Sequence, residues 1–402
     1  MAHAYPRDLA HFVHDRLREE GVDQELPTLI HVLSAAYQAS LLRDEERPLS
    51  FRLLLLAPED LPEHAAPSDG HHRLRFERPR NLHEQELRRL APAAKMHRAM
   101  MGVSDLRIWG LVHTGPGWLR AMQGGRGGAA PMPEALSVAV TAPGRVLVSR
   151  GDVPIAKLAG GHITGKAANV FDSKWLPRAF AEVRREVSEV LIDRDLLRMI
   201  GQDFVRRVIA TIRLARHGGA ILNLPNEVAD RVAETNRPIA MKYRLMNEEP
   251  RRRYGTLVRR ALDALAMAGA NWQSYSASKA PEILAVDEGL NELAHTIAGL
   301  ADVDGAVVMS KQLEIMGFGG EIVGDLPDMP IVMRASDLEG EVREEEATDG
   351  VGTRHRSVYR LCAAIHDALG IVVSQDGGVR PVGVKDGAVT YWDQLGVGPM
   401  DI

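Results

Sequence analysis

Cysteine, long apolar runs and excess positive charge are what this chain of 402 residues lacks. Its single cysteine, Cys362, leaves no pair for an internal disulfide, which excludes a disulfide-stapled fold and fits a reducing compartment. No run approaches the roughly 18 apolar residues that span a bilayer, and the N-terminus lacks the apolar core of a signal peptide. The net charge of -5 gives no basic field for coating nucleic acid. We therefore expect a cytoplasmic, soluble protein without a membrane or nucleic-acid partner.

What the chain does have is a globular composition, with 45% apolar and 26% charged residues. A chain of this length exceeds one ordinary core, so two domains are expected. We predict an N-terminal α+β domain with a mainly antiparallel sheet over residues 1–172 and a connecting helix over 173–202. A C-terminal α/β domain, with a central mixed sheet flanked by helices, is predicted over 203–402.

The N-terminal part has the periodicity of short helices and strands. Helices are predicted at 8–20, 28–45 and 81–101, and strands at 51–56, 73–76, 106–112, 136–140 and 145–149. His11, His14 and His31 have no carboxylate or cysteine at a ligand-like spacing, so they do not indicate a metal site. Because no catalytic constellation is present here, we expect a sensory or regulatory module.

In the C-terminal part, helical and strand patterns alternate, which is typical of a layered α/β structure. Helices are predicted at 174–217 (with an interruption near Gly201), 256–268 and 288–300, and strands at 220–224 and 315–321. The acidic stretch between Glu321 and Gly352 is predicted to be a solvated loop.

The first segment with chemical potential is Asp304-Gly305-Ala306, at the mouth of an apolar strand. An aspartate held there can ligate Mg²⁺ or Mn²⁺, because hard cations bind one or two carboxylates together with substrate phosphates. Gly305 allows a close approach to the backbone. An ordinary turn aspartate before a strand has the same pattern.

The second segment, Gly352-Thr353-Arg354-His355-Arg356, opens a helix predicted to reach Leu369. The first turn of a helix presents free N–H groups and the positive end of the dipole, which together attract anions. Arg354 and Arg356 add guanidinium donors suited to phosphate oxygens. Since cations at a helix start are unfavourable by about 0.3–1 kcal/mol, their presence indicates an anion rather than a plain basic cap.

The third segment, Ser374-Gln375-Asp376-Gly377-Gly378, follows the buried strand Ile371-Val372-Val373. Asp376 offers a second carboxylate for a metal or a ribose, and Ser374 offers a hydroxyl. An Asp-Gly hairpin turn is the alternative interpretation.

The order and local context of these three segments resemble the diadenylate cyclase (DAC) domain family, over about residues 203–396. That resemblance implies condensation of two ATP molecules to cyclic di-AMP with release of pyrophosphate, an Mg²⁺ or Mn²⁺ cofactor, and a homo-oligomer that is at least a dimer when active. It implies catalytic roles for Asp304, Arg354, His355 and Arg356, and a metal site at Asp304 and Asp376. Nucleotide contacts are implied for Gly305, Ala306, Gly352, Thr353, Ser374 and Asp376, and Phe318 and Glu321 on the following strand are placed to contact a base.

The sequence also departs from the family pattern. The paired acids of the third segment are Gln375 and Asp376 here, Val303 stands where a histidine is frequent, and the acidic stretch lengthens the chain before Gly352. Two other functions therefore stay open. One is a non-catalytic nucleotide-binding sensor, and the other is an interaction protein that uses the cyclase-like domain only as a scaffold.

Overall fold

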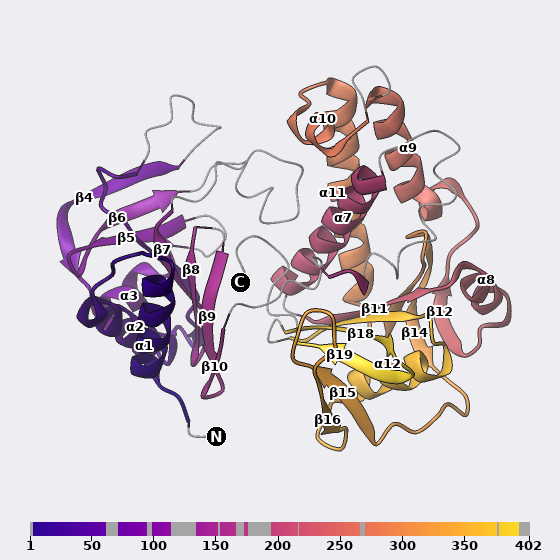
Figure 1. Cartoon of the computed structure of the whole chain (residues 1–402). Coiled ribbons are helices and arrows are strands. Elements are labelled where there is room, and N and C mark those ends of the chain that lie inside the picture. The colour runs from indigo at the N-terminus through magenta and orange to yellow at the C-terminus, as the bar shows by residue number, and fades with distance from the viewer. Residues whose placement is uncertain are drawn as a thin grey trace. The chain divides into compact units, whose positions relative to one another are not determined.

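The chain divides into two compact units in a computed structural model, shown in Figure 1. The structure describes residues 3–61, 71–94, 99–113, 134–151, 153–165, 173–175, 194–215, 217–265, 270–375 and 378–393. Both units combine helices with a mixed sheet, so the predicted α+β and α/β classes are confirmed. No helix within these ranges is both long and apolar enough to cross a membrane.

The first unit is built on an eight-stranded sheet in the order β10-β9-β8-β7-β3-β5-β6-β4. All neighbouring strands are antiparallel except the pair β3–β5. Helix α1 packs against α2 and β9, and α2 packs against β7 and β8, so that their apolar faces share one core with β3. The elements are α1 (Pro6–Glu19), α2 (Leu26–Ser40), β1 (Arg43–Asp44), β2 (Arg47–Pro48), β3 (Phe51–Leu55), β4 (His72–Asn81), α3 (Glu84–Leu90), β5 (Ala99–Ser104), β6 (Arg107–His113), β7 (Leu136–Ala142), β8 (Arg145–Arg150), β9 (Val153–Ala159) and β10 (His162–Thr164).

Two helix predictions in this unit extend too far. The helix predicted over 28–45 ends at Ser40, and Arg43–Asp44 forms a short strand. The helix predicted over 81–101 begins later, at Glu84 with His83 as its N-cap, and ends at Leu90. Residues from Ala99 onward form the central strand β5 instead. A β-carbon at Gly102 would lie 2.2 Å from the Trp109 ring, so tight packing against the neighbouring strand decides the structure of this segment.

The second unit is built on a nine-stranded sheet in the order β12-β14-β13-β11-β17-β18-β19-β15-β16. Its central strands β11 and β13 are parallel, and β17 runs antiparallel to β11. The elements are α7 (Arg194–Ala215), β11 (Gly219–Leu224), α8 (Asn226–Thr235), β12 (Ile239–Arg244), η2 (Glu249–Arg252), α9 (Arg253–Leu265), α10 (Trp272–Ala277), α11 (Pro281–Ala301), β13 (Ala306–Ser310), β14 (Ile315–Ile322), β15 (Ile331–Ala335), β16 (Arg343–Ala347), α12 (Thr353–Ala364), β17 (Leu369–Val373), β18 (Val379–Lys385) and β19 (Ala388–Trp392).

Helices cover both faces of this sheet (Figure 1). On β11, Ile221 faces a core shared with α7, α9, α10 and α11, whereas Leu222 faces a core shared with α8 and α12. Successive residues of a strand point to opposite faces, so the near-continuous apolar strands of this unit are those of a sheet buried on both sides.

Three sequence predictions need correction in this unit. Helix α7 passes through Gly201 without interruption. Helix α12 ends at Ala364 rather than Leu369, which is already part of β17. The acidic stretch after Glu321 is an ordered hairpin, β15–β16, and not a loop. The predicted connecting helix over 173–202 lies largely outside the described residues, with 173–175 and the start of α7 as the exceptions.

Candidate nucleotide site

The three sequence segments come together at one edge of the sheet in the second unit. In the register between β11 and β13, Ile221 is opposite Val307, so continuing past the strand ends places Gly218 opposite Asp304. On the other side of β11, Gly219 is opposite Val373, which places Gly218 opposite Ser374. Gly218 directly precedes β11, Asp304 lies two residues before β13 and Ser374 directly follows β17, so all three lie at the same end of these neighbouring strands.

Arg354 of α12 reaches the same point. A β-carbon at Gly218 would lie 3.2 Å from Nη1 of Arg354, 2.8 Å from the carbonyl oxygen of Val373 and 3.1 Å from the amide nitrogen of Gln375. Gly218 has a φ of +68°, a conformation that favours glycine. The absence of a side chain at this position therefore leaves the space that the Arg354 guanidinium occupies.

Asp304 has an exposed side chain beside a cation that the sequence did not single out. Lys242 on β12 forms an ion pair with Glu321 on β14, with 2.6 Å between Nζ and Oε1. The hydrogen bond to Glu321 raises the pKa of Lys242, and the charge of Asp304 contributes to the same shift. Glu321, predicted to contact a base, is thus engaged by a lysine.

Gly305 and Ala306 pack against neighbouring elements at the start of β13. Gly305 has a φ of +112°, and a β-carbon there would lie 2.6 Å from the carbonyl carbon of Gly319. The close approach that requires glycine is therefore to the neighbouring strand β14. Ala306 is buried, with its side chain in the core shared with α8 and α12.

The start of α12 combines exposed and half-buried groups. Gly352 is its N-cap without a side-chain hydrogen bond, and no acidic residue lies in the first turn. Thr353 and Arg356 are exposed, whereas Arg354 and His355 are half-buried. Helix N–H groups, the dipole and two guanidinium groups thus add up to a positive field at one end of α12.

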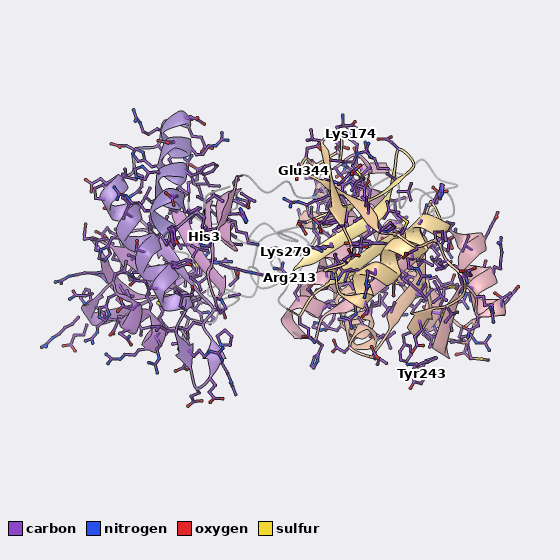
Figure 2. The ribbon with its side chains drawn as sticks, turned by 90° about the horizontal axis from the view of Figure 1, so that it is seen from below. His3, Lys174, Arg213, Tyr243, Lys279 and Glu344 are labelled. Atoms are coloured by element: carbon purple, nitrogen blue, oxygen red, sulfur yellow. The ribbon has the colours of Figure 1, made fainter. Side chains whose placement is uncertain are left out.

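Phe318 lies farther along β14, where it stacks on Tyr243 of the edge strand β12 with ring centroids 4.7 Å apart. Tyr243 is 52% exposed, so the pair is an accessible aromatic surface on the unit. In Figure 2, Tyr243 lies at the end of this unit away from Lys174 and Glu344.

In the third segment, the amide of Ser374 donates to the carbonyl of Gly378 at 2.8 Å, closing the turn from β17 to β18. Asp376 lies outside the described residues.

Sequence reasoning missed a polar cluster that packs on the buried side of α12. Arg380 on β18 forms an ion pair with Asp393 at 2.7 Å, and its guanidinium lies 4.7 Å from the Tyr391 ring centroid. Tyr391 donates its hydroxyl to Glu346 at 2.6 Å and stacks on Tyr359 of α12. A lone arginine between Val379 and Val382 in an otherwise apolar strand was the signal that could have revealed it.

Burial governs the titration of the tyrosines in this cluster. Burial raises the pKa of Tyr359 to about 12, although the neighbouring Arg380 acts in the opposite direction. Burial also raises the pKa of Tyr391, and its hydrogen bond to Glu346 adds to the effect. Both hydroxyls are therefore neutral at physiological pH, and the cluster is structural support for α12 rather than a source of protons.

The chemistry of the donor set suits a divalent cation that is shared with a bound triphosphate. Asp304 supplies a solvent-accessible carboxylate, and magnesium commonly binds one or two carboxylates plus substrate phosphates. No group of three or more His, Cys, Asp or Glu side chains is placed to hold an ion in the described part of the chain.

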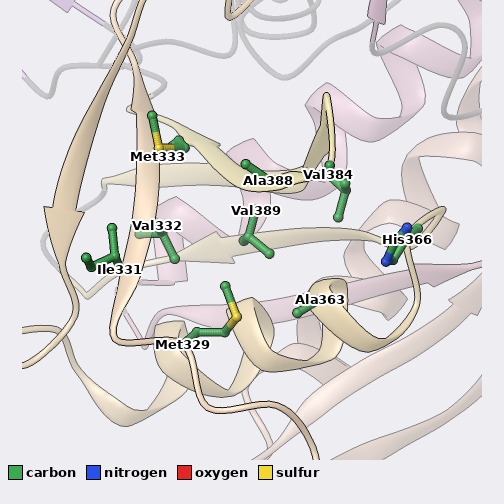
Figure 3. A pocket seen from close by; sticks show the side chains of 10 residues that line it. Met329, Ile331, Val332, Met333, Ala363, His366, Val384, Ala388 and Val389 are labelled. Carbon is green, nitrogen blue, oxygen red and sulfur yellow. The ribbon is translucent and has the colours of Figure 1, made fainter.

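A hollow of about 200 Å³ lies at the opposite end of α12. Figure 3 shows its walls, which come from the C-terminal end of α12, the start of β15 and the β18–β19 turn. Its lining is apolar except for one histidine and consists of Met329, Ile331, Val332, Met333, Ala363, His366, Val384, Gly387, Ala388 and Val389. Without cationic donors, it does not suit a polyphosphate.

Comparison with known protein families gives a match within the first unit. Residues 23–113 match the family described as "Probable sensor domain DACNV". This stretch covers α2 and the strands β1 to β6, and the match is consistent with the N-terminal sensory or regulatory module that the sequence predicted. Neither the curated proteins nor the solved structures contain a match to the chain.

Proposed function

We propose that the second unit is a nucleotidyltransferase of the diadenylate cyclase type, which joins two ATP molecules into cyclic di-AMP under control of the N-terminal unit. The observation that supports the proposal is that Asp304 and the Ser374 turn lie at the same end of neighbouring strands, where Arg354 approaches Gly218. A carboxylate and a guanidinium beside a helix N-terminus offer what a metal-bound polyphosphate needs.

In the proposed reaction, the ribose 3′-hydroxyl of one nucleotide attacks the α-phosphorus of the other. A new P–O bond forms, the bond to pyrophosphate breaks, and the hydroxyl proton leaves to a base or to water. A second transfer of the same kind, in which the two nucleotides exchange the roles of attacking and attacked group, closes the ring and releases the second pyrophosphate. Such transfers depend mainly on positioning and on neutralising charge.

The residues divide these tasks by their chemistry. Asp304 would hold Mg²⁺ or Mn²⁺, which supplies charge neutralisation on the phosphates. Arg354, Arg356 and the first-turn N–H groups of α12 would bind phosphate oxygens, with His355 and Thr353 beside them. The two linkages need two nucleotides face to face, so the active form is proposed to be at least a homodimer.

A second function, nucleotide binding without turnover, is favoured by one specific feature. The third segment offers the amide of Gln375 where a carboxylate is frequent in the family that the sequence resembles. An amide cannot share the charge of a divalent cation as a carboxylate does. On this alternative, the site senses a nucleotide and the cationic start of α12 is retained for binding.

One experiment separates these functions. Purified protein is incubated with ATP and Mn²⁺, and the products are resolved by chromatography. A cyclic dinucleotide that disappears in Asp304→Asn and Arg354→Ala supports the cyclase, whereas ATP binding without product supports the sensor. A melting temperature that shifts with none of the four NTPs would contradict both and favour a scaffold.

The charge-matched control is Arg259→Ala. Arg259 lies on α9, away from the edge that carries Asp304, and its side chain is exposed. The Arg259→Ala substitution removes the same positive charge as Arg354→Ala without touching the proposed site, so ATP binding should be unchanged in this variant.

A further inference from the structure

The chain segment that enters the second unit is anchored to it at residues 173–175. Ser173 is buried, and the backbone amide of Lys174 donates to both carboxylate oxygens of Glu339, at 2.9 and 3.2 Å. Trp175 stacks on Trp392 with ring centroids 4.1 Å apart and an interplanar angle of 20°. These contacts lie within the second unit, and they fix the point where the chain arrives from the sensor side of the sequence.

Trp392 belongs to β19, the strand whose Tyr391 packs on Tyr359 of α12. Trp392 faces the core shared with α7 and α11, whereas the preceding Tyr391 faces the core shared with α12. Asp393 follows and holds Arg380 at 2.7 Å. Because successive residues face opposite sides of a strand, a ring docked on Trp392 fixes the strand that presents Tyr391 to the other face.

The contact continues into the candidate site. Tyr391 stacks on Tyr359, with ring centroids 6.0 Å apart, and Tyr359 lies one helical turn after His355 on α12. The cationic first turn of α12 is therefore supported by a strand whose far face is clamped by Trp175. The path from Trp175 runs through the stack on Trp392, the neighbouring Tyr391 on β19, and the stack of Tyr391 on Tyr359, whose ring lies 6.5 Å from that of His355.

We propose that Trp175 is a positioning residue that couples the arriving chain to the nucleotide site, through Trp392, β19 and the start of α12. The inference rests on the proposed function, because it assigns a regulator to that same site. When Trp175 is docked, β19 and α12 hold the geometry in which Arg354 reaches Gly218. When a signal from the first unit withdraws Trp175, that support loosens and nucleotide affinity falls.

The docked state is suited to reversal. The indole N–H groups of Trp175 and Trp392 are both buried without a hydrogen-bond partner in the part of the chain that the structure describes. A buried donor without an acceptor opposes burial, and water satisfies it once the ring leaves. Packing, and not an indole hydrogen bond, therefore holds the two rings together.

The test uses the full chain with Trp175→Ala and Trp175→Phe. The phenylalanine variant keeps a stacking ring and removes one unsatisfied N–H, so it should behave like the wild type. Trp272→Ala is the matched control, since Trp272 packs on Tyr275 and on the same core from α10 and not from β19. Circular dichroism confirms that each variant is folded.

Hydrogen exchange measured without nucleotide gives the first readout. In Trp175→Ala, we expect amides of 389–393 and 353–359 to exchange at least about fivefold faster, which is the lower end of typical coupling between two sites. Faster exchange confined to residues next to 175, or equal acceleration in Trp272→Ala, would overturn the coupling.

The second readout is the ATP dissociation constant, which should rise by a similar factor in Trp175→Ala and stay unchanged in the other two variants. An unchanged ATP constant together with faster exchange would overturn the regulatory role. If the wild type binds no nucleotide, the proposed function fails, and the exchange result alone still decides whether Trp175 positions α12.

Discussion

At the scale of single residues, Gly218 is the position on which the candidate site depends. It precedes β11 at the end of the sheet where Asp304 and Ser374 also lie, and a β-carbon there would lie 3.2 Å from Nη1 of Arg354. Glycine is also required by its backbone conformation, with φ at +68°. Space and conformation can be separated by experiment because another glycine shares only the second property.

We expect Gly218→Ala to weaken ATP binding about as much as Arg354→Ala, because the new methyl group would displace the guanidinium. It should also lower the free energy of unfolding by about 1–2 kcal/mol through backbone strain. The control is Gly387→Ala, with a φ of +77° and no atom within 4 Å of the added carbon. Urea unfolding should show a larger loss for Gly218→Ala, because its added carbon also lies 2.8 Å from the carbonyl oxygen of Val373, while titration with ATP should show a defect only at position 218.

A second residue-scale prediction concerns pH. Burial in the layer of helices raises the pKa of Asp203 to about 7, and the neighbouring Arg206 and Arg207 oppose this shift only in part. Since the folded value exceeds the unfolded one, the stability that this group contributes is complete below about pH 4 and is lost as the pH rises through 7. Asp287, paired with Arg207, adds a like charge that also raises the pKa of Asp203.

Asp203→Asn should therefore remove part of the pH dependence. Between pH 5 and pH 8, the wild type should lose on the order of 2 kcal/mol more free energy of unfolding than the asparagine variant. Urea titrations at the two pH values measure the difference, with the exposed Asp302→Asn as control. A wild type whose stability rises over this range relative to Asp203→Asn would contradict the assignment.

At the scale of elements, the β15–β16 hairpin is joined to the rest of the sheet by both backbone and side chains. Strand β15 runs parallel to β19, and Tyr391 donates to Glu346 across this junction. The acidic strand β16 forms the edge of the sheet, where charged side chains protect a strand from pairing with other molecules. The hairpin thus shields one side of β19 while the Trp175 stack covers one of its faces.

We expect Tyr391→Phe to lower the free energy of unfolding by about 1.5–3 kcal/mol, as is typical for loss of a hydrogen bond to a charged group. The ring and its stacking on Tyr359 remain, so the change isolates the hydroxyl. Tyr243→Phe is the control, because Tyr243 is 52% exposed and its ring also stays in place. Equal effects of the two substitutions in chemical denaturation would show that the bond to Glu346 does not stabilise the hairpin.

At the scale of the whole molecule, the chain joins a unit with a sensor-type match to a unit with a candidate nucleotide site. Each unit has its own sheet and its own core. On the proposed function, a signal could pass through the chain between the units or through an assembly of copies. The anchor at Trp175 offers the first route, and the proposed dimer offers the second.

If two copies complete one active site, specific activity should rise with protein concentration and level off when the dimer is saturated. Product formation per mole of chain, measured over a hundredfold dilution series at saturating ATP, tests this expectation. Mixing an inactive Asp304→Asn chain with the wild type gives the complementary measurement, because mixed dimers should reduce the yield of cyclic product. Activity per chain that is constant on dilution and on mixing would point to a monomer.

The sequence by itself determined the features that local periodicity and backbone chemistry fix. Three features follow from short-range patterns: the mixed helix and strand class, the strand that follows Asp304, and the helix that begins at Thr353. The cationic start of α12 could be recognised because an unfavourable charge at a helix terminus is visible in the sequence alone.

Only the tertiary structure decided which residues meet. The sequence predicts a helix to residue 101, but Gly102 packs on Trp109 and Ala99–Ser104 is a strand. The acidic segment is predicted as a loop, but Tyr391, 45 positions away, binds Glu346 in a strand. The place of Gly218 between two motifs, and of Trp175 on Trp392, depends in the same way on strand registers and ring packing. Such contacts join residues far apart in the chain, so their energy leaves no trace in a local pattern.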